Sequence, residues 1–195
     1  MIISVVSLKG GVGKTLTAVS LASALAEEGR CLLIDSDPHR SALSWSEKVG
    51  DAFPCTVVGL PVRDLHRRIR DLTDGYANAV IDTPPNDAVV ARSAVLAADT
   101  VVVPLSPSTM DVDRLAETLR LVAEVEADHP VDLRVLVVKV RRRTRLAEDV
   151  RTVLEELDAP LLRSSIPLRE AYAGAFGAPP APHVDYSAVL EEIRS

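Results

Sequence analysis

The segment SLKGGVGKTLT, Ser7–Thr17, governs the interpretation of this sequence. It ends with the Gly-Lys-Thr triplet of a phosphate-binding P-loop, but the usual pattern, Gly-x-x-x-x-Gly-Lys-[Ser/Thr], has glycine where this chain has Leu8. A lysine, Lys9, follows the missing glycine. The segment is therefore either a phosphate loop of a different form or a glycine-rich turn with an exposed lysine. The sequence on both sides favours the phosphate loop.

An apolar run, residues 2–8, leads into three glycines, and a helical pattern begins near Lys14. Glycines allow backbone N–H groups to turn toward an anion, and a helix start adds the positive end of its dipole. In this context Lys14 is expected to reach the β- and γ-phosphates, and the Thr15 hydroxyl is expected to bind Mg²⁺. The segment thus predicts a nucleotide site at a strand-to-helix turn.

Short apolar runs alternate with helical patterns along the rest of the chain. The runs predicted as strands are 2–8, 31–37, 55–60, 78–85, 100–106 and 133–140. The predicted helices are 14–28, 62–73, 110–127 and 144–157, with a last short helix within 185–195. Continuously apolar strands are covered on both faces. The pattern predicts one α/β domain over 1–195: a three-layer sandwich with a mostly parallel, twisted sheet and helices on both faces.

Carboxylates follow two of the predicted strands. Asp35 and Asp37 end the run LLIDSD, and Asp82 ends the run AVID. Ligands of open α/β sheets bind beyond the carboxyl ends of the strands, and carboxylates there suit a magnesium-nucleotide site. One such aspartate is as readily a turn residue, but three of them beside a phosphate loop favour the nucleotide site.

Composition excludes several other classes of protein. The chain has 195 residues, 47% hydrophobic and 3% aromatic, and a net charge of −6, which disfavours a generally basic nucleic-acid binder. Its two cysteines, Cys31 and Cys55, form no Cys-x-x-Cys pair, which favours a reducing cytoplasm over a disulfide framework. We expect no signal peptide and no membrane span, because the apolar runs are too short.

Three motifs together, KGGVGKT, DSDPHRSA and VIDTPP, resemble the ParA/MinD group of P-loop ATPases, whose loop has the form Lys-Gly-Gly-x-x-Lys-[Ser/Thr]. The sequence is most similar to the small ParA-type (ParF-like) plasmid partition ATPases, and the likeness covers nearly the whole chain. The resemblance implies an ATPase that converts ATP and water to ADP and phosphate with Mg²⁺, weakly alone and faster with a partner protein.

The resemblance also implies roles for individual residues. The implied catalytic residues are Lys9, which crosses a dimer interface to the partner's ATP, Lys14, and Asp37, which orients the attacking water. The implied metal residues are Thr15, Asp35 and Asp82. The implied nucleotide-binding residues are Lys9, Gly10, Gly11, Val12, Gly13, Lys14, Thr15, Leu16, Ile166 and Pro167.

Some positions depart from the family. His39 stands where relatives often have Gln, and Leu16 replaces a frequent second Thr. Relatives often place Asn or Arg near the adenine ring in the stretch that here reads Lys139, Val140 and Arg141. The base contact is therefore not assigned from these side chains.

The shared site makes ATP a switch between two states. The γ-phosphate attracts the partner's lysine, so ATP favours a homodimer and hydrolysis weakens it. The expected function is DNA segregation, in plasmid or chromosome partition. The expected partners are non-specific DNA and a ParB-type centromere-binding protein, with no membrane contact, in a cytoplasmic, nucleoid-associated setting.

A basic run, KVRRRTR, is the candidate DNA-binding patch. It contains the arginines Arg141, Arg142, Arg143 and Arg145. Arginines before a helix start oppose the helix dipole, which suggests a use such as binding phosphate backbones. The alternative is a solvated loop whose charges pair with Glu148 and Asp149.

Other functions of this family remain as alternatives. A MinD-like positioning ATPase for another cargo is disfavoured as a membrane-bound form, because the tail DYSAVLEEIRS is acidic and not a basic amphipathic helix. An iron-sulfur relative such as the nitrogenase iron protein requires cysteine ligands after the second switch of the family, which the segment Thr83–Asp87 resembles here, and this chain has no cysteine beyond Cys55. A small-molecule enzyme such as a dethiobiotin-synthetase-like ATPase is the remaining alternative.

Overall fold

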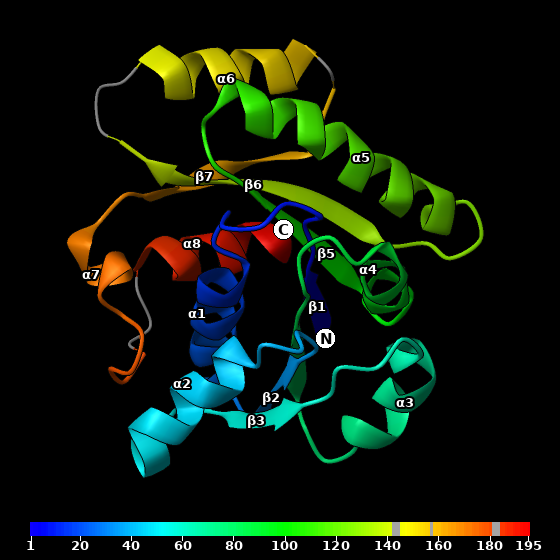
Figure 1. The fold of residues 1–195 in the computed structure, drawn as a ribbon, viewed down its shortest axis with the longest axis vertical. Helices are drawn as coiled ribbons and strands as arrows, with labels where there is room; N and C mark the ends of the chain where they lie inside the picture. Colours follow the sequence, from blue (N-terminus) through cyan, green and yellow to red (C-terminus); the bar gives the residue numbers. More distant parts are fainter. Residues whose placement is uncertain (142–144, 157, 181–183) are drawn as a thin grey trace.

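The computed structural model describes residues 1–141, 145–156, 158–180 and 184–195. Its strands form a seven-stranded parallel sheet in the order β3-β2-β4-β1-β5-β6-β7 (Figure 1). The strands are β1 Ile2–Val5, β2 Cys31–Asp35, β3 Thr56–Gly59, β4 Asn78–Asp82, β5 Thr100–Leu105, β6 Asp132–Val140 and β7 Leu161–Pro167.

Helices cover both faces of this sheet, which confirms the predicted three-layer α/β fold. One face carries α1 (Lys14–Ala26), α2 (Ser41–Val49), the short α7 (Glu170–Ala173) and α8 (Val184–Ile193). The other face carries α3 (Leu65–Leu72), α4 (Ala88–Leu96), α5 (Thr109–Glu126) and α6 (Arg145–Glu156). A 3₁₀ turn, η1 (Gly50–Ala52), follows α2.

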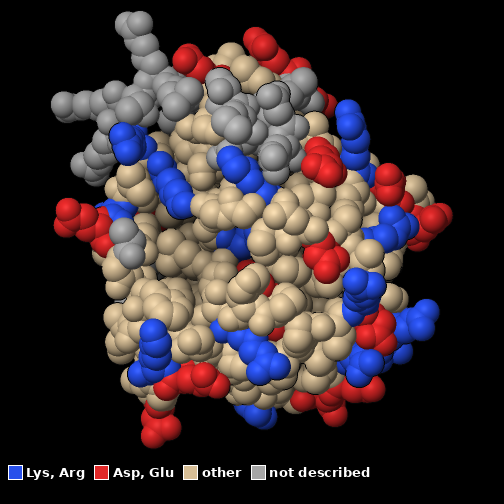
Figure 2. Space-filling view, viewed as in Figure 1, with Lys and Arg blue, Asp and Glu red and all other residues tan. Residues whose placement is uncertain are grey.

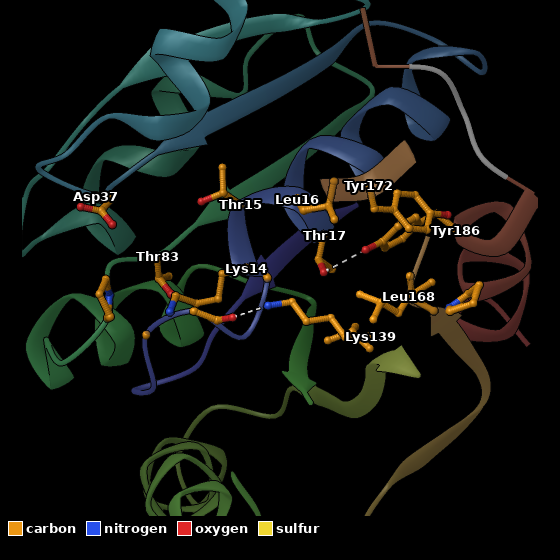
Figure 3. A pocket seen from close by; sticks show the side chains of 17 residues that line it. Lys14, Thr15, Leu16, Thr17, Asp37, Thr83, Lys139, Leu168, Tyr172 and Tyr186 are labelled. Carbon is orange, nitrogen blue, oxygen red and sulfur yellow. Dashed lines mark hydrogen bonds between the residues drawn. The ribbon is translucent and has the colours of Figure 1, made fainter. Parts of the chain in front are cut away.

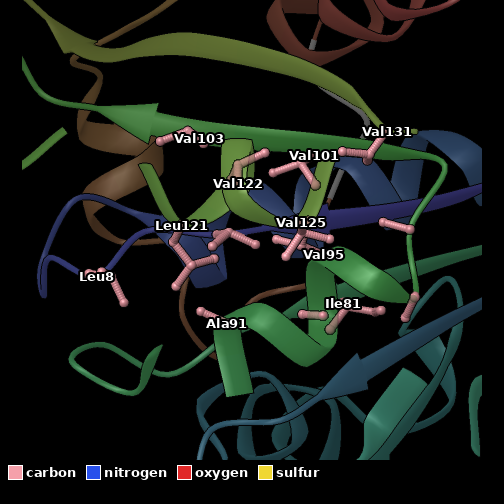
Figure 4. Close-up of a cluster of buried hydrophobic side chains, with 14 of the residues drawn as sticks. Leu8, Ile81, Ala91, Val95, Val101, Val103, Leu121, Val122, Val125 and Val131 are labelled. Atoms are coloured by element: carbon pink, nitrogen blue, oxygen red, sulfur yellow. The ribbon is translucent and has the colours of Figure 1, made fainter. Parts of the chain in front are cut away.

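Each central strand contributes to two hydrophobic cores. In β2, Leu32 and Ile34 pack into the cluster beneath α3, α4 and α5, whereas Cys31 and Leu33 pack beneath α1 and α2. Figure 4 shows part of the first cluster, where side chains of α4 and α5 meet those of the strands. Side chains of a strand alternate between faces, so a strand covered on both faces is apolar at every position.

Several elements differ from the sequence prediction. The strand β7 and the helices α2, α4 and α7 were not predicted, and the predicted strand 78–85 ends at Asp82. Pro84 and Pro85 follow within three residues and have no N–H to extend the ladder. Thr144, the predicted N-cap of helix 144–157, lies outside the described residues.

The strand order positions the site. β1 lies between β4 and β5, where the order of strands along the chain reverses, and such a reversal opens a crevice at the carboxyl ends of parallel strands. Asp82 is in register with Val5 on one side and with Asp35 on the other. The glycine-rich loop and the two carboxylate motifs therefore begin side by side.

Candidate nucleotide-binding site

The loop after β1 explains why leucine replaces the usual first glycine. Leu8 is 7% exposed and packs into the core beneath α4 and α5 (Figure 4), and its N–H donates to the Thr118 hydroxyl. Gly11 (φ 76°) and Gly13 (φ 93°) adopt the left-handed conformation that favours glycine. Gly13 precedes α1 and no side chain caps the helix, so its first N–H groups are suited to an anion.

Lys14 is a buried cation at the start of α1. The residue is 7% exposed, and its Nζ donates to the carbonyl oxygen of Lys9 at 2.8 Å. Burial lowers the pKa of Lys14, and the negative charges of Asp82 and Asp37 oppose that shift. Two further N–H groups of this ammonium remain for an anionic ligand.

Asp82 is a fully buried carboxylate whose two oxygens have no hydrogen-bond partner among the residues that the structure describes. Burial and, after it, the charge of Asp35 raise the pKa of Asp82 to about 7, although the Thr15 hydroxyl and Lys14 act in the opposite direction. Thr15 is thus close enough to influence Asp82 without forming a hydrogen bond of normal geometry. A buried carboxylate without partners is costly unless a ligand supplies one.

The orphaned carboxylate tests whether the site suits Mg²⁺. Among the described residues, no three His, Cys, Asp or Glu side chains gather into a metal site of their own. Mg²⁺ at phosphoryl-transfer sites usually takes one or two protein ligands and completes its shell with phosphates and water. Asp82 and the neighbouring Thr15 hydroxyl fit that requirement. Bound there with a nucleotide, Mg²⁺ supplies positive charge to the transferred phosphoryl group.

Asp35 and Asp37 organise the loop that leads to α2. The oxygens of Asp35 accept hydrogen bonds from the N–H groups of Asp37 (3.1 Å) and Leu43 (3.0 Å). Oδ1 of Asp37 accepts from the N–H of His39 at 2.8 Å and lies 2.9 Å from His39 Nδ1. Because the backbone already donates hydrogen bonds to both oxygens of Asp35, Asp82 is the better candidate for a magnesium ligand. The roles of both aspartates remain predictions.

The segment after β4, which resembles the second switch of the family, is tied to the phosphate loop. The Thr83 hydroxyl donates to the Val5 carbonyl oxygen at 2.8 Å, and the N–H of Asn86 donates to the Leu8 carbonyl oxygen at 3.0 Å. Asp87 then caps α4 by accepting from the N–H groups of its first turn. A movement of this segment therefore reaches both the loop and α4.

A cavity of about 580 Å³ lies at the carboxyl edge of the sheet (Figure 3). It brings together nine of the predicted residues: Gly10, Gly11, Gly13, Lys14, Thr15, Leu16, Asp37, Ile166 and Pro167. The lining does not include four others: Lys9, Val12, Asp35 and Asp82. Val12 points into the protein and is 2% exposed, and Lys9 is half-buried.

The far side of the cavity contains residues that sequence reasoning missed. Tyr172 and Tyr186 pack edge to face with ring centroids 5.9 Å apart, and the hydroxyl of Tyr186 lies 3.2 Å from that of Thr17. The Tyr172 hydroxyl donates to Asp185 at 2.7 Å, and Arg169 pairs with the same carboxylate. Figure 3 shows both rings opposite Lys14 and Asp37. Tyr172 lies in IPLREAYAGAFG, a segment that shares the likeness to the family, but the sequence assigned neither tyrosine a role, because α8 packs on α1 only in the folded chain.

Lys139 also lines the cavity, at the end of β6. Its Nζ donates to the Gly11 carbonyl oxygen at 2.5 Å, as the dashed line in Figure 3 shows. The sequence assigned this lysine to the basic run and to the stretch near the adenine ring. A signal for its contact with the loop was absent, since the two residues are 128 positions apart.

The predicted DNA patch is only partly described. Arg141 is exposed, Arg142 and Arg143 lie outside the described residues, and Arg145 is the first residue of α6. Figure 2 shows Lys and Arg interspersed with Asp and Glu over the visible face rather than in one basic surface. DNA binding therefore remains a prediction.

Two further expectations concern cysteines and membranes. Cys31 and Cys55 are free, and burial raises the pKa of each thiol to about 12, which disfavours a reactive thiolate. Within the part of the chain that the structure describes, no helix has both the length and the apolar character needed to cross a bilayer.

Comparison with known proteins identifies the family. Residues 3–179 match the model of the CobQ/CobB/MinD/ParA nucleotide binding domain. The chain is 37% identical over 179 residues to maintenance of carboxysome distribution protein A of Gloeobacter kilaueensis, covering 91% of this chain and 78% of that protein. It is 32% identical over 223 residues to the chromosome-partitioning ATPase Soj of Thermus thermophilus, covering 95% and 89%. The chain belongs to this family of ParA/MinD-type P-loop ATPases, as the loop predicted.

Solved structures share the fold. The ATP complex of a single-residue variant of Cyanothece McdA superimposes with a TM-score of 0.79 at 18% identity, covering 99% of this chain and 96% of that one. The MinD protein of Pyrococcus horikoshii, complexed with Mg-ADP, gives 0.76 at 22% identity, covering 98% and 93%. The expectation of ATP and Mg²⁺ is confirmed at the level of the family, because adenine nucleotides with or without magnesium occupy these structures.

Proposed function

We propose that the chain is an ATP-hydrolysing dimerisation switch that positions a cargo inside the cell. The observation that carries the proposal is the cavity in which Lys14, Thr15 and Asp37 meet, with the orphaned carboxylate of Asp82 next to Thr15. These are the parts that phosphoryl transfer requires: cations, a magnesium site and a group that orients water.

The dimer is the second part of the proposal. Lys9 does not belong to the lining of its own subunit's cavity, although its neighbours Gly10 and Gly11 do. In a dimer with the two loops facing each other, each Lys9 reaches the partner's γ-phosphate. ATP then joins the subunits, and hydrolysis releases them because the γ-phosphate departs.

Sedimentation with no nucleotide, with ADP and with ATP tests the switch. We expect dimers with ATP and monomers otherwise. A Lys9→Ala variant is expected to remain monomeric with ATP, while Lys48→Ala, a lysine on α2 outside the cavity, behaves like wild type. A Lys9→Ala variant that dimerises and hydrolyses ATP normally contradicts the shared site.

The catalytic role of Asp37 has a different signature. An Asp37→Ala variant is expected to bind ATP and dimerise but to hydrolyse ATP at least about a hundredfold more slowly, because water is no longer oriented. The matched control is Asp64→Ala, at the start of α3 and outside the cavity. Wild-type turnover in the Asp37 variant contradicts the proposed role.

The first candidate cargo is DNA, in plasmid or chromosome partition with a ParB-type partner. The ATP-bound dimer is then expected to bind non-specific DNA, which doubles the contribution of the basic run Arg141, Arg142, Arg143 and Arg145 and places the protein on the nucleoid. DNA binding that requires ATP and falls steeply with salt supports this function. Binding that is unchanged when Arg141, Arg142 and Arg143 are all replaced by Ala places the patch elsewhere.

The second candidate cargo is a large protein assembly. It is favoured by the 37% identity to a carboxysome distribution protein, which exceeds the 32% identity to Soj. The two candidates separate in cells that carry Asp37→Ala. Plasmid loss or cells without chromosomes indicate partition, whereas normal DNA inheritance with a mislocalised protein assembly indicates the second cargo.

A further inference from the structure

We propose that Lys139 is a second lysine of the same subunit that binds the phosphate chain of the nucleotide. The inference rests on the nucleotide site proposed above and adds a residue to it. Neither the glycine-rich loop nor the aspartate motifs include this position. The resemblance implies that the corresponding stretch of relatives lies near the base, and it assigns no phosphate contact to this position.

The position of Lys139 is the first argument. Its Nζ donates to the Gly11 carbonyl oxygen at 2.5 Å, and its Cε lies 3.8 Å from the point where a Cβ on Gly13 would stand. The side chain therefore crosses from the end of β6 to the two left-handed glycines of the phosphate loop. It lines the same cavity as Lys14 (Figure 3).

The backbone at Lys139 is the second argument. Its φ of 59° is left-handed, a conformation that a residue with a Cβ adopts only at a cost. The pairing of β6 with β7 also shifts register between Val137 and Val140. Strain of this kind is retained where surrounding structure holds it, and it concentrates at ligand sites.

The chemistry of the contact is the third argument. A carbonyl oxygen beside a phosphate repels it, and an ammonium bound to that oxygen masks the repulsion. The Gly11 carbonyl takes one N–H of Lys139 and leaves two for phosphate oxygens. Lys14 makes the same kind of contact, with the Lys9 carbonyl. One subunit thus places two ammonium groups on loop carbonyls beside a single cavity.

Two other roles for Lys139 give different results. If Lys139 contacted the base, its replacement would lower the affinity for adenosine as much as the affinity for ATP. A purely structural tie between β6 and the loop would lower thermal stability and would survive in Lys139→Gln, whose amide also donates to a carbonyl. Only a phosphate contact depends on the positive charge and on the number of phosphates.

Calorimetric titration with adenosine, ADP, ATP and inorganic triphosphate, each with Mg²⁺, distinguishes these roles. We expect Lys139→Met and Lys139→Gln to lower the affinity for ATP and for triphosphate about tenfold or more, which corresponds to the loss of a charged hydrogen bond. The affinity for adenosine is expected to change less than about twofold. Lys139→Arg keeps the charge and most of the affinity. Lys48→Met, outside the cavity, is the matched control.

The outcomes separate the inference from the proposed function. Two results overturn the phosphate contact but leave the proposed switch intact, provided that the wild-type protein binds ATP. In the first, the Lys139 variants bind ATP as tightly as wild type. In the second, they lose as much affinity for adenosine as for ATP. Loss of ATP affinity in Lys139→Met with full affinity in Lys139→Gln also overturns it, because the tie alone then matters. Wild-type protein that binds neither ATP nor triphosphate overturns both.

Discussion

At one end of the cavity the Asp82 carboxylate is buried without a hydrogen-bond partner among the described residues, whereas at the other end the tyrosine hydroxyls are paired. The loop end consists of Gly10, Gly11, Gly13, Lys14, Thr15 and Asp37, with the orphaned carboxylate of Asp82 next to Thr15. The aromatic end consists of Ile166–Leu168, Tyr172 and Tyr186, with Thr17 and Asp185 as hydroxyl partners. The two ends face each other across one cavity, and they differ in whether their buried polar groups have hydrogen-bond partners.

The difference separates groups that wait for a ligand from groups that hold the fold. Buried charge at the loop end lowers the free energy of unfolding as long as no anion or cation is bound there. Binding of a nucleotide with Mg²⁺ is expected to restore that stability. The aromatic end contains the edge-to-face tyrosine pair and buries it as an ordinary core does. Changes at the aromatic end are thus expected to affect folding, and changes at the loop end to affect binding.

Tyr186→Ala is expected to have the largest effect. Tyr186 lies on α8, is 1% exposed and reaches Thr17 of α1, so its removal leaves a cavity that costs about 3–5 kcal/mol of unfolding free energy. Urea denaturation measures the loss. The half-buried Tyr76→Ala is the control and is expected to lose less. An unchanged unfolding free energy in Tyr186→Ala would show that the aromatic end is not part of the core.

Asp82→Asn tests the loop end through pH. The folded protein keeps a proton on Asp82 up to about pH 7, whereas the unfolded chain releases it near the ordinary pKa of 3.8. The folded state therefore holds more protons between these values, and the stability of the nucleotide-free protein falls as pH rises. Asn lacks this decline, so the variant is expected to be more stable than wild type at pH 8 by on the order of 2–4 kcal/mol.

Urea denaturation at pH 5 and pH 8 with a chelator present makes the measurement. The difference between Asp82→Asn and wild type is expected to shrink at pH 5. Asp51→Asn, on the exposed turn after α2, removes the same charge and is expected to stay within about 0.5 kcal/mol of wild type at pH 8. An Asp82→Asn variant less stable than wild type at pH 8 would mean that the carboxylate is already satisfied.

Lys14→Met is expected to affect binding and not folding. The affinity for ATP should fall about a hundredfold, because a buried ammonium no longer meets the phosphates. The unfolding free energy of the nucleotide-free protein should stay the same or rise, since burial already disfavours the charged form. Calorimetry and denaturation on one preparation, with Lys48→Met beside it, make the comparison. Equal losses in folding and binding would remove the distinction between the two ends.

Tyr172→Phe is expected to have the smallest effect. It removes the hydroxyl that donates to Asp185 at 2.7 Å and keeps the ring, so the unfolding free energy should fall by about 1 kcal/mol. ATP affinity should change little. The control is Tyr76→Phe, whose hydroxyl has no hydrogen bond among the described residues. A larger loss of ATP affinity than of stability would assign the hydroxyl to ligand binding.

Much of the loop end was predictable because it is local in sequence. The glycines, Lys14 and Thr15 lie within six residues, and the backbone geometry that they require is set by neighbours along the chain. Asp35 and Asp82 were placed beside the loop by a general property of parallel sheets, whose strands all end at one edge. Their register against each other across β2 and β4 confirms that placement.

The aromatic end was not predictable in the same way. Ile166 and Pro167 came from the resemblance alone, and the strand β7 that carries them was missed, as was α7, which carries Tyr172. In β7 only Leu162 and Ile166 are buried, so its sequence LLRSSIP lacks the continuous apolar pattern of the central strands. Such edge elements take their conformation from the neighbours they pack against.

The sequence by itself determined the fold class, the phosphate loop and the family, because each depends on short-range patterns and on the rules of parallel sheets. Only the tertiary structure decided that Leu8 enters the core, that Asp82 finds no hydrogen-bond partner within the described part of the chain, and that Lys139 reaches Gly11 across 128 residues. The physical reason is that burial and hydrogen bonding join residues distant along the chain. Their partners are chosen by packing, which periodicity and motif spacing do not encode.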